Sequence, residues 1–142
     1  MNVKLMEFKV LGDHRGSLVA LETGRQVPFS VARVYYIFGT QPGVKRGRHS
    51  HKKLNQLCVA VAGSCRMTLD DGRERTEVVL NHADRGLVIP PGIWHEMDDF
   101  SPDCVLVVLA DHVYDEADYI RDYATFLASM EAGASPGKMS PV

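Results

Sequence analysis

The 142-residue sequence has little of what several classes of protein require. Its three cysteines, Cys58, Cys65 and Cys104, are too few and too widely spaced for a disulfide framework or a cysteine-rich zinc site. No stretch approaches the ~18 apolar residues of a membrane span, and the N-terminal residues carry charges where a secretory signal needs an apolar run. The formal net charge is only -2, so we expect no general attraction to nucleic acid or to an anionic membrane. These absences predict a reduced, cytoplasmic protein that binds neither nucleic acid nor membrane.

The composition of the chain is that of a single globular domain. Hydrophobic residues make up 45% of the chain and charged residues 24%, which is typical of a globular domain with its own core. We expect a single domain over residues 1–130. The segment 131–142 lacks periodicity and is expected to be a disordered tail.

Short β-strand patterns separated by turn residues fill the first 110 residues. Alternating or continuous apolar runs predict strands at 3–10, 17–22, 29–38, 54–61, 64–70, 74–80, 86–89 and 104–110. The first two are expected to pair as a hairpin, and the meander that follows favours antiparallel pairing throughout. The sequence therefore predicts an all-β antiparallel sandwich or small barrel.

The pattern changes to helical spacing near residue 115. Asp115 and the acidic residues that follow it resemble a helix start, and apolar residues recur at helical intervals up to about Met130. We expect a C-terminal amphipathic α-helix over this range, packed on the sheet.

Three histidines are the strongest candidates for a functional site. His49 and His51 are one residue apart on an extended segment, so their side chains point the same way. His95 follows a Pro-Pro-Gly turn and is the best candidate to meet them. A lone histidine is usually a satisfied polar residue of the core, but three converging ones are costly to bury without purpose. The sequence predicts that the three line one pocket, and it leaves open whether they hold a metal or move protons.

Cationic residues occur close to these histidines. Lys45 and Arg46 lie in the preceding loop, where they would suit a phosphate group. Arg33 and Tyr35 share one face of the strand at 29–38 and could form a wall of the pocket. An ordinary surface arginine would explain Arg33 equally well.

Two motifs resemble those of the cupin superfamily. Gly43-x5-His49-x-His51-x4-Gln56-x6-Gly63 is similar to the first cupin motif, with Gln56 where metal-binding cupins carry a glutamate. Pro90-x-Gly92-x2-His95 is similar to the core of the second motif. The resemblance implies a cupin jelly roll. Three imidazoles can hold a divalent ion without a carboxylate, so Gln56 weakens a metal site without removing it.

A more specific resemblance extends from near the N-terminus to about residue 126. The matching segments are Asp13–Ala20, Arg33–Phe38, Arg46–Lys53, Gly63–Arg66, Leu69–Gly72, Trp94–Met97, Asp99–Ser101 and Tyr114–Arg121. Together they resemble the sugar 3,4-ketoisomerase family. This resemblance implies a homodimeric enzyme without metal or other cofactor. Its reaction would move the keto group of dTDP-4-dehydro-6-deoxy-D-glucose from C4 to C3, toward the 3-amino-3,6-dideoxyhexoses of surface polysaccharides.

The resemblance also implies roles for individual residues. His51 would be the main base, and His49 would be either the second acid/base or the group that stabilises the enediolate. The residues expected to bind substrate are Arg15, Arg33, Arg46 and Lys53 at the diphosphate, Tyr35, Tyr36 and Trp94 at the thymine or sugar, Gln56 orienting a histidine, and His95 at the sugar end. Arg15 and His95 favour dTDP-3-dehydro-6-deoxy-D-galactose as the product. For each aromatic residue, packing in the core is an equal explanation.

Three other functions stay open. A metal-dependent cupin enzyme and a non-enzymatic sugar-binding cupin both fit the histidine motif. A 3,5-epimerase acting on the same sugar would pair a histidine with a tyrosine acid. The His49-x-His51 pair and the segment Tyr114–Arg121 favour the ketoisomerase instead.

Overall fold

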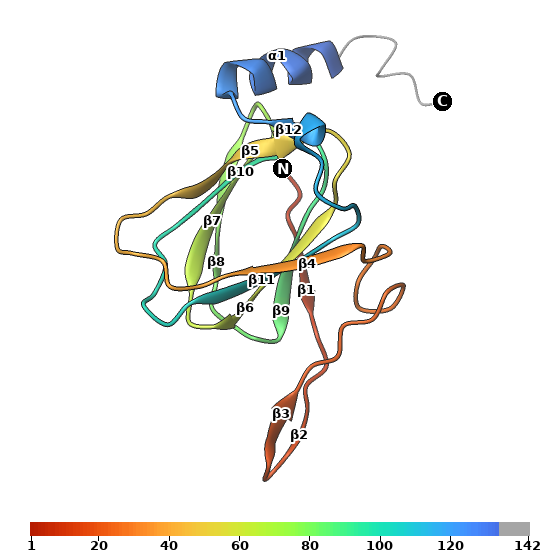
Figure 1. Ribbon diagram of the computed structural model, residues 1–142, viewed down its shortest axis with the longest axis vertical. Helices are drawn as coiled ribbons and strands as arrows, with labels where there is room; N and C mark the ends of the chain where they lie inside the picture. The colour runs from red at the N-terminus through yellow and green to blue at the C-terminus, as the bar shows by residue number, and fades with distance from the viewer. Residues whose placement is uncertain (134–142) are drawn as a thin grey trace.

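Two five-stranded antiparallel sheets face each other in the computed structural model, which describes residues 1–133 (Figure 1). The first sheet has the order β1 (Lys4–Glu7), β9 (Arg85–Ile89), β6 (Gln56–Ala62), β11 (Val105–Ala110) and β4 (Arg33–Ile37). The second has the order β12 (Tyr119–Ile120), β5 (Arg46–His51), β10 (Trp94–Asp98), β7 (Cys65–Asp70) and β8 (Arg75–Leu80). The antiparallel β-sandwich expected from the sequence is confirmed, as is a C-terminal helix, α1 (Tyr123–Gly133).

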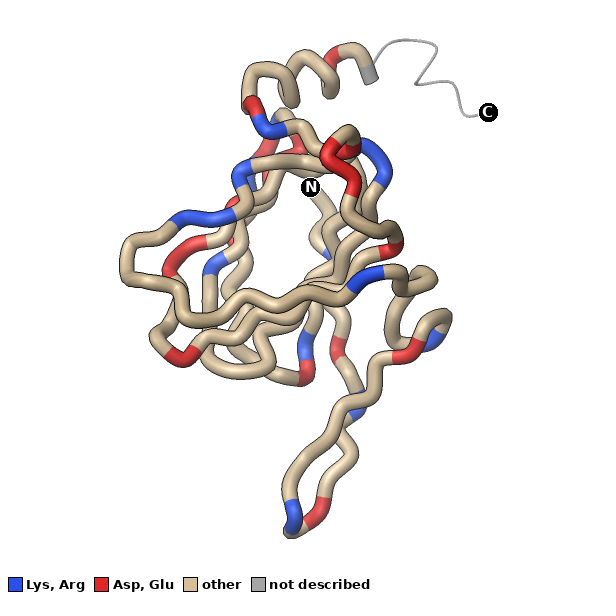
Figure 2. The backbone as a smooth tube through the Cα atoms, viewed as in Figure 1, with Lys and Arg blue, Asp and Glu red and all other residues tan. Residues whose placement is uncertain are grey.

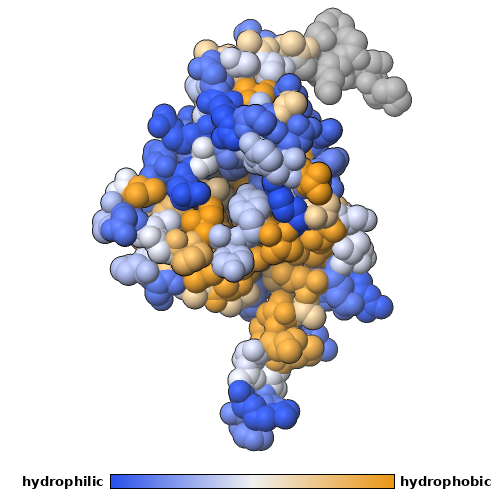
Figure 3. Space-filling model, viewed as in Figure 1, coloured by the Kyte–Doolittle hydropathy of each residue, from blue (hydrophilic) through white to orange (hydrophobic). Residues whose placement is uncertain are grey.

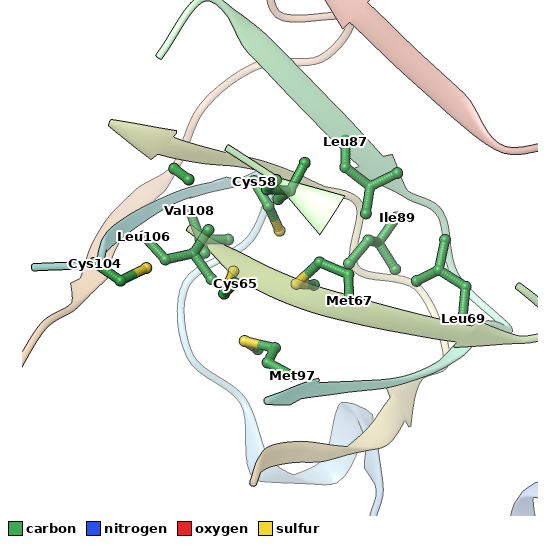
Figure 4. Packing of buried hydrophobic residues seen from close by; sticks show 12 residues of the cluster. Cys58, Cys65, Met67, Leu69, Leu87, Ile89, Met97, Cys104, Leu106 and Val108 are labelled. Atoms are coloured by element: carbon green, nitrogen blue, oxygen red, sulfur yellow. The ribbon is translucent and has the colours of Figure 1, made fainter. Parts of the chain in front are cut away.

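The main core lies between the two sheets. Cys65, Met67 and Leu69 of β7 are buried, whereas the residues between them are partly exposed, as the period-2 pattern predicted. All three cysteines are free and buried, and Figure 4 shows them among leucine, valine and methionine side chains. They are core residues, as expected.

A smaller apolar cluster covers the outer face of the first sheet. Leu57, Val59 and Leu109 pack there under Val27 and its neighbours from the segment between β3 and β4. Both faces of the sheet are therefore apolar near its centre, which explains why β6 reads as a continuous hydrophobic run.

The N-terminal strands differ from the expectation. β1 pairs with β9, not with the strand that follows it. The hairpin is formed by β2 (Leu11–Asp13) and β3 (Gly16–Leu18), which make a separate two-stranded sheet. Figure 1 shows this hairpin extending away from the barrel. The turn residues were identified correctly, but pairing between distant strands cannot be read from a local pattern.

The C-terminal helix begins later than predicted. Asp115 caps only a short 3-10 helix, η1 (Glu116–Asp118), and the chain then adds β12 to the edge of β5 before α1 begins at Tyr123. The expected helical run from Asp115 is wrong because Asp118 is buried and Tyr119 pairs with His51. α1 continues to Gly133, and residues 134–142 of the expected tail lie outside the described part of the chain. Within residues 1–133, no helix is long and apolar enough to cross a membrane.

Candidate active site

The three histidines meet at one end of the barrel. His49 and His51 project from β5, and His95 stands directly opposite His49 on β10. The ring centroid of His49 is 4.9 Å from that of His51 and 4.6 Å from that of His95. One ring nitrogen of each histidine lies within 4.8 Å of those of the other two. The expected convergence of the three side chains is thus present.

A β-bulge in β5 determines which neighbouring side chains join them. His49 pairs with His95, but Gly47 already pairs with Glu96, so Arg48 is an extra residue in the strand. Gly47 and Arg48 both have a positive φ, 78° and 62°, which glycine adopts without strain but which is strained for Arg48. In an undistorted strand Arg46 would point to the face opposite His49. The bulge instead pairs Arg46 with the buried Met97, so Arg46 lies on the same face of the sheet as His49.

His51 is held by a buried carboxylate. Its Nδ1 lies 3.1 Å from Oδ2 of Asp118, and the backbone N–H of Lys53 donates to the other oxygen, Oδ1, at 2.8 Å. Both partners are almost fully buried, at 3% and 6% exposure. The carboxylate can only accept, so Nδ1 carries the proton and Nε2 keeps its lone pair.

Burial keeps the three imidazoles neutral. Desolvation, followed by the nearby His51, lowers the pKa of His49 to about 4. Desolvation and the other two imidazoles lower the pKa of His95 to about 3. The pKa of His51 is also lowered by desolvation, although Asp118 acts in the opposite direction. At neutral pH all three are therefore proton acceptors.

A cavity of about 250 Å³ opens beside this cluster. It is lined by Arg33, Tyr35, Ile37, Arg46, Gly47, His49, Met97, Tyr119 and Arg121. Three guanidinium groups around one cavity form a local cationic site on a chain whose net charge is slightly negative. Figure 2 shows Lys and Arg positions on β4, on β5 and on the connection to α1, the three segments that supply these arginines.

Aromatic rings hold two of these arginines. The guanidinium carbon of Arg33 lies 5.3 Å from the ring centroid of Tyr35, and that of Arg121 lies 4.2 Å from the ring centroid of Tyr119. Nε of Arg33 is buried and has no hydrogen-bond partner among the described residues. Such a buried donor is available to a bound anion.

Gln56 has a different partner from the one expected. Its Nε2 donates to the hydroxyl of Tyr35 at 2.7 Å, not to a histidine. Gln56 is 2% exposed, so it supports the cavity wall through Tyr35.

Two expected aromatic contacts lie elsewhere. Tyr36 is 62% exposed on the outer face of β4, because adjacent residues of a strand point to opposite faces and Tyr35 occupies the inner one. Trp94 is likewise on the opposite face from His95, where it packs on Tyr123 and Phe126 of α1. Neither lines the cavity within the described chain: Trp94 packs in the core as the alternative explanation expected, whereas Tyr36 lies on the surface.

Two expected cations also lie outside the cavity. The ammonium group of Lys53 lies 4.0 Å from Asp115 on the surface, and only the backbone N–H of this residue reaches the site. Arg15 is at the tip of the β2–β3 hairpin, 79% exposed and hydrogen bonded to Asp13. Within one chain, therefore, Arg15 does not meet the histidines.

The sequence analysis missed Asp118, Tyr119 and Arg121. The ring centroid of Tyr119 lies 4.3 Å from that of His51 and 4.9 Å from that of His49. All three residues belong to the segment Tyr114–Arg121, whose motif was noticed but to which no role was given. A helical interpretation of this segment concealed that it runs along β5.

The chain is similar to known proteins over almost all of its length. It matches the family model described as FdtA: WxcM-like, C-terminal over residues 1–131. It is 52% identical over 126 residues to TDP-4-oxo-6-deoxy-alpha-D-glucose-3,4-oxoisomerase of Aneurinibacillus thermoaerophilus, a match covering 89% of this chain and 91% of that protein.

Solved structures agree with this match. The crystal structure of a 3,4-ketoisomerase from Helicobacter canadensis superimposes with a TM-score of 0.90 at 43% identity, covering 92% of this chain and 98% of that one. QdtA, a sugar 3,4-ketoisomerase from Thermoanaerobacterium thermosaccharolyticum in complex with TDP, gives 0.91 at 40% identity, covering 94% and 98%. The chain described here belongs to the FdtA family of WxcM-like, C-terminal domains.

Proposed function

We propose that the protein is a sugar 3,4-ketoisomerase acting on dTDP-4-dehydro-6-deoxy-D-glucose. The observation that carries this proposal is a neutral His51 whose Nδ1 is fixed by buried Asp118 while Nε2 has no partner among the described residues. An imidazole in this state is a general base for proton abstraction next to a carbonyl. Its location beside three arginines suits a diphosphate-linked substrate, and relatives at 40–52% identity are named for this activity.

The reaction needs two linked proton transfers. Nε2 of His51 removes the proton from C3, and the electrons form a C3–C4 enediolate with the negative charge on O4. The same proton is then returned to C4, while the hydroxyl proton of O3 is lost and O4 gains one. A second neutral imidazole can carry the hydroxyl proton from O3 to O4, and His49, which lines the cavity, is in position to do so. No net oxidation occurs, and no redox cofactor is needed.

The arginines bind the diphosphate. Arg33, Arg46 and Arg121 line one cavity from three different segments, and guanidinium groups bind phosphate oxygens through paired hydrogen bonds. The cavity is smaller than the ~300–1,000 Å³ of typical small-molecule sites, so part of a nucleotide sugar must extend beyond it.

Access to the base involves Tyr119. His51 is 3% exposed and does not line the cavity, whereas Tyr119 lines the cavity and contacts the His51 ring. Tyr119 is on β12, a strand of only two residues. Binding of the hexose would turn the Tyr119 ring aside and bring C3 within reach of Nε2, since catalytic contacts often tighten only in the substrate complex.

The galacto configuration is the expected product stereochemistry. The C3 and C4 hydrogens lie on the same face of a galacto-configured ring and on opposite faces of a gluco-configured ring. A single base such as His51 can remove the C3 hydrogen and deliver a hydrogen to C4 on the same face of the ring. Formation of the gluco product would require a separate acid on the other face.

The active protein is proposed to be a homodimer. A two-stranded hairpin is marginally stable alone, yet β2–β3 extends from the barrel with Leu11 and Leu18 about half exposed, at 48% and 56%. Figure 3 shows the apolar surface continuing from the barrel onto the base of this hairpin. β4 is an edge strand with an unpaired side, and it carries Arg33 and Tyr35 of the cavity. If each hairpin pairs with the β4 edge of the other copy, the contact is self-complementary and places Arg15 near the partner's cavity.

A coupled assay tests the activity. The protein is incubated with dTDP-4-dehydro-6-deoxy-D-glucose, and the 3-keto product is trapped with an aminotransferase and analysed by NMR. We expect a 3-amino sugar with the galacto configuration, with and without a chelator. Deuterium from solvent at C3 and C5 without a 3-keto product would instead indicate an epimerase, and binding of dTDP-sugar without turnover would indicate a binding protein.

Mixed dimers test the placement of Arg15. Arg15→Ala and His51→Asn should each be nearly inactive, because each lacks one component at every site. If Arg15 acts in the partner's site, random mixing should restore about one quarter of the wild-type activity, since half of the dimers are mixed and one of their two sites is intact. Absence of recovery in a mixture shown to exchange subunits would mean that Arg15 does not act across the dimer.

The compartment and pathway follow from the same proposal. A nucleotide-activated sugar substrate is consistent with a cytoplasmic enzyme, and a 3-keto sugar is the form that an aminotransferase converts to a 3-amino-3,6-dideoxyhexose.

A further inference from the structure

Of the three arginines that line the cavity, Arg121 alone pairs with a carboxylate in the described part of the chain. Its Nε donates to Oε2 of Glu116 at 2.8 Å, and its Nη2 donates to Oε1 at 2.9 Å. Glu116 lies in η1 and does not itself line the cavity. Both side chains are more than half exposed, and an exposed ion pair adds little to stability. Stabilisation of the fold is therefore a poor explanation for this pair.

The contacts of Arg121 leave one edge of its guanidinium group for a ligand. The group carries five N–H donors, which form an Nε–Nη2 edge and an Nη1–Nη2 edge. Glu116 occupies the Nε–Nη2 edge, and the ring of Tyr119 covers one face of the group, with its centroid 4.2 Å from the guanidinium carbon. The Nη1–Nη2 edge, which Glu116 does not use, has the fork geometry that binds two phosphate oxygens.

Tyr114 in turn holds Glu116. The hydroxyl of Tyr114 donates to Oε1 of Glu116, and its ring centroid lies 5.9 Å from the guanidinium carbon of Arg33. Hydrogen bonds from Arg121, and then from Tyr114, lower the pKa of Glu116 to about 2, so its carboxylate is ionised at neutral pH. Glu116 is thus a fixed negative charge beside a cationic cavity.

We propose that Glu116 is a positioning residue for the diphosphate, which holds Arg121 with its Nη1–Nη2 edge available to the ligand before binding. This inference rests on the proposed function, because it takes the diphosphate to be the group that Arg121 binds. A free arginine side chain samples many rotamers and loses that freedom when it binds a ligand. Glu116 and Tyr119 restrict the side chain beforehand, which should strengthen binding by about 2–10-fold.

A carboxylate at this position also has the opposite effect. It repels the diphosphate and competes with it for Arg121. Glu116→Asp separates the two effects, because the charge is retained while a side chain shorter by one methylene no longer reaches both donors of Arg121. Positioning predicts weaker binding of dTDP to this variant, whereas competition predicts tighter binding.

Calorimetric titration with dTDP and steady-state kinetics with dTDP-4-dehydro-6-deoxy-D-glucose test the proposal. In Glu116→Asp, we expect the Kd for dTDP and the KM each to rise about 2–10-fold, with kcat within about twofold of the wild type. A disturbed backbone at η1 would instead lower kcat, because Asp118, which holds His51, belongs to the same short helix. Tyr114→Phe removes only the hydroxyl that supports Glu116 and should give a smaller rise in Kd.

Glu77→Asp is the matched control. The side chain of Glu77 is 60% exposed and pairs with Arg66 at 3.5 Å, and neither residue lines the cavity. The Kd for dTDP should therefore be that of the wild type. Circular dichroism and thermal melting establish that each variant is folded.

The Arg121→Ala background shows whether Glu116 acts through Arg121. In that background, Glu116→Asp should change the Kd for dTDP no further, because the group that it positions is gone. The same loss of affinity in both backgrounds, an unchanged or lower Kd in Glu116→Asp alone, or a fall in kcat at unchanged Kd would overturn the proposal. Wild-type protein that binds dTDP with the expected dependence on Glu116 but does not convert the sugar would count against the proposed reaction alone.

Discussion

Substitution of Asp118 by asparagine should disable the base without removing it. Asp118 accepts two hydrogen bonds, one from the backbone N–H of Lys53 at 2.8 Å and one from Nδ1 of His51 at 3.1 Å. The backbone N–H can only donate, so the asparagine oxygen has to remain with Lys53 and its NH₂ group has to face His51. His51 would then accept at Nδ1 and carry its proton on Nε2, the atom that should act as the base.

The expected size of the effect follows from this tautomer change. A general base contributes ~10²–10⁴-fold to the rate, so kcat of Asp118→Asn should fall by about that factor. The affinity for dTDP should change little, because the arginines of the cavity are untouched. Since Asp118 raises the pKa of His51, its loss should also move the acid limb of the kcat/KM profile to lower pH.

Steady-state kinetics across pH and calorimetric titration with dTDP measure these effects. Asp115→Asn is the matched control, because Asp115 is exposed, caps η1 and can be replaced there by asparagine. Wild-type kcat in Asp118→Asn, or an acid limb shifted to higher pH, would refute the assignment. The tautomer itself can be read from the ¹⁵N shifts of His51.

Three further predictions concern stability. Phe126→Ala should destabilise the protein by about 3–5 kcal/mol, because Phe126 is 0% exposed and anchors α1 on Trp94. The fluorescence of Trp94, the only tryptophan, should shift to the red, whereas an unchanged melting temperature and spectrum would contradict this anchoring. Gly63→Ala should cost about 2 kcal/mol or more in chemical denaturation, because a Cβ there would clash with Oγ of Ser101 and with the backbone of Cys104, and the φ is +63°. In metal-free buffer, the wild type should lose about 2 kcal/mol of stability between pH 7 and pH 5 through His95, whose pKa is about 3 when folded and about 6.5 when unfolded. The unfolded chain binds the additional proton as the pH falls, so His95→Leu should show a correspondingly smaller loss.

The sequence predicted those features that depend on local pattern. The alternation in β4 correctly placed Arg33 and Tyr35 on the same face of that strand. The spacing of His49 and His51 correctly placed both histidines on the same face of β5. The alternation in β4 also places Tyr36 on the opposite face from Tyr35 and therefore outside the cavity, although the resemblance had grouped the two tyrosines together.

Features that depend on distant parts of the chain were not predictable in this way. Asp118 lies 67 residues after His51, and its local sequence is that of the acidic first turn of a helix. Only the pairing of β12 with β5 brings its carboxylate to His51. Trp94 illustrates the reverse, since only the docking of α1 shows that its side chain faces the helix and not the cavity.

The extra residue in β5 has a consequence for how this pocket can change. In a regular strand, odd and even positions are locked to opposite faces, so one insertion or deletion inverts every residue beyond it. Here the extra residue Arg48 lets Arg46 point to the same face as His49, although the two are three residues apart. Deleting Arg48 would therefore turn Arg46 away from the cavity while leaving His49 and His51 where they are. In this strand, the number of residues controls the position of Arg46 separately from that of the histidines, so a change of chain length can alter the lining of the cavity without a substitution at any lining residue.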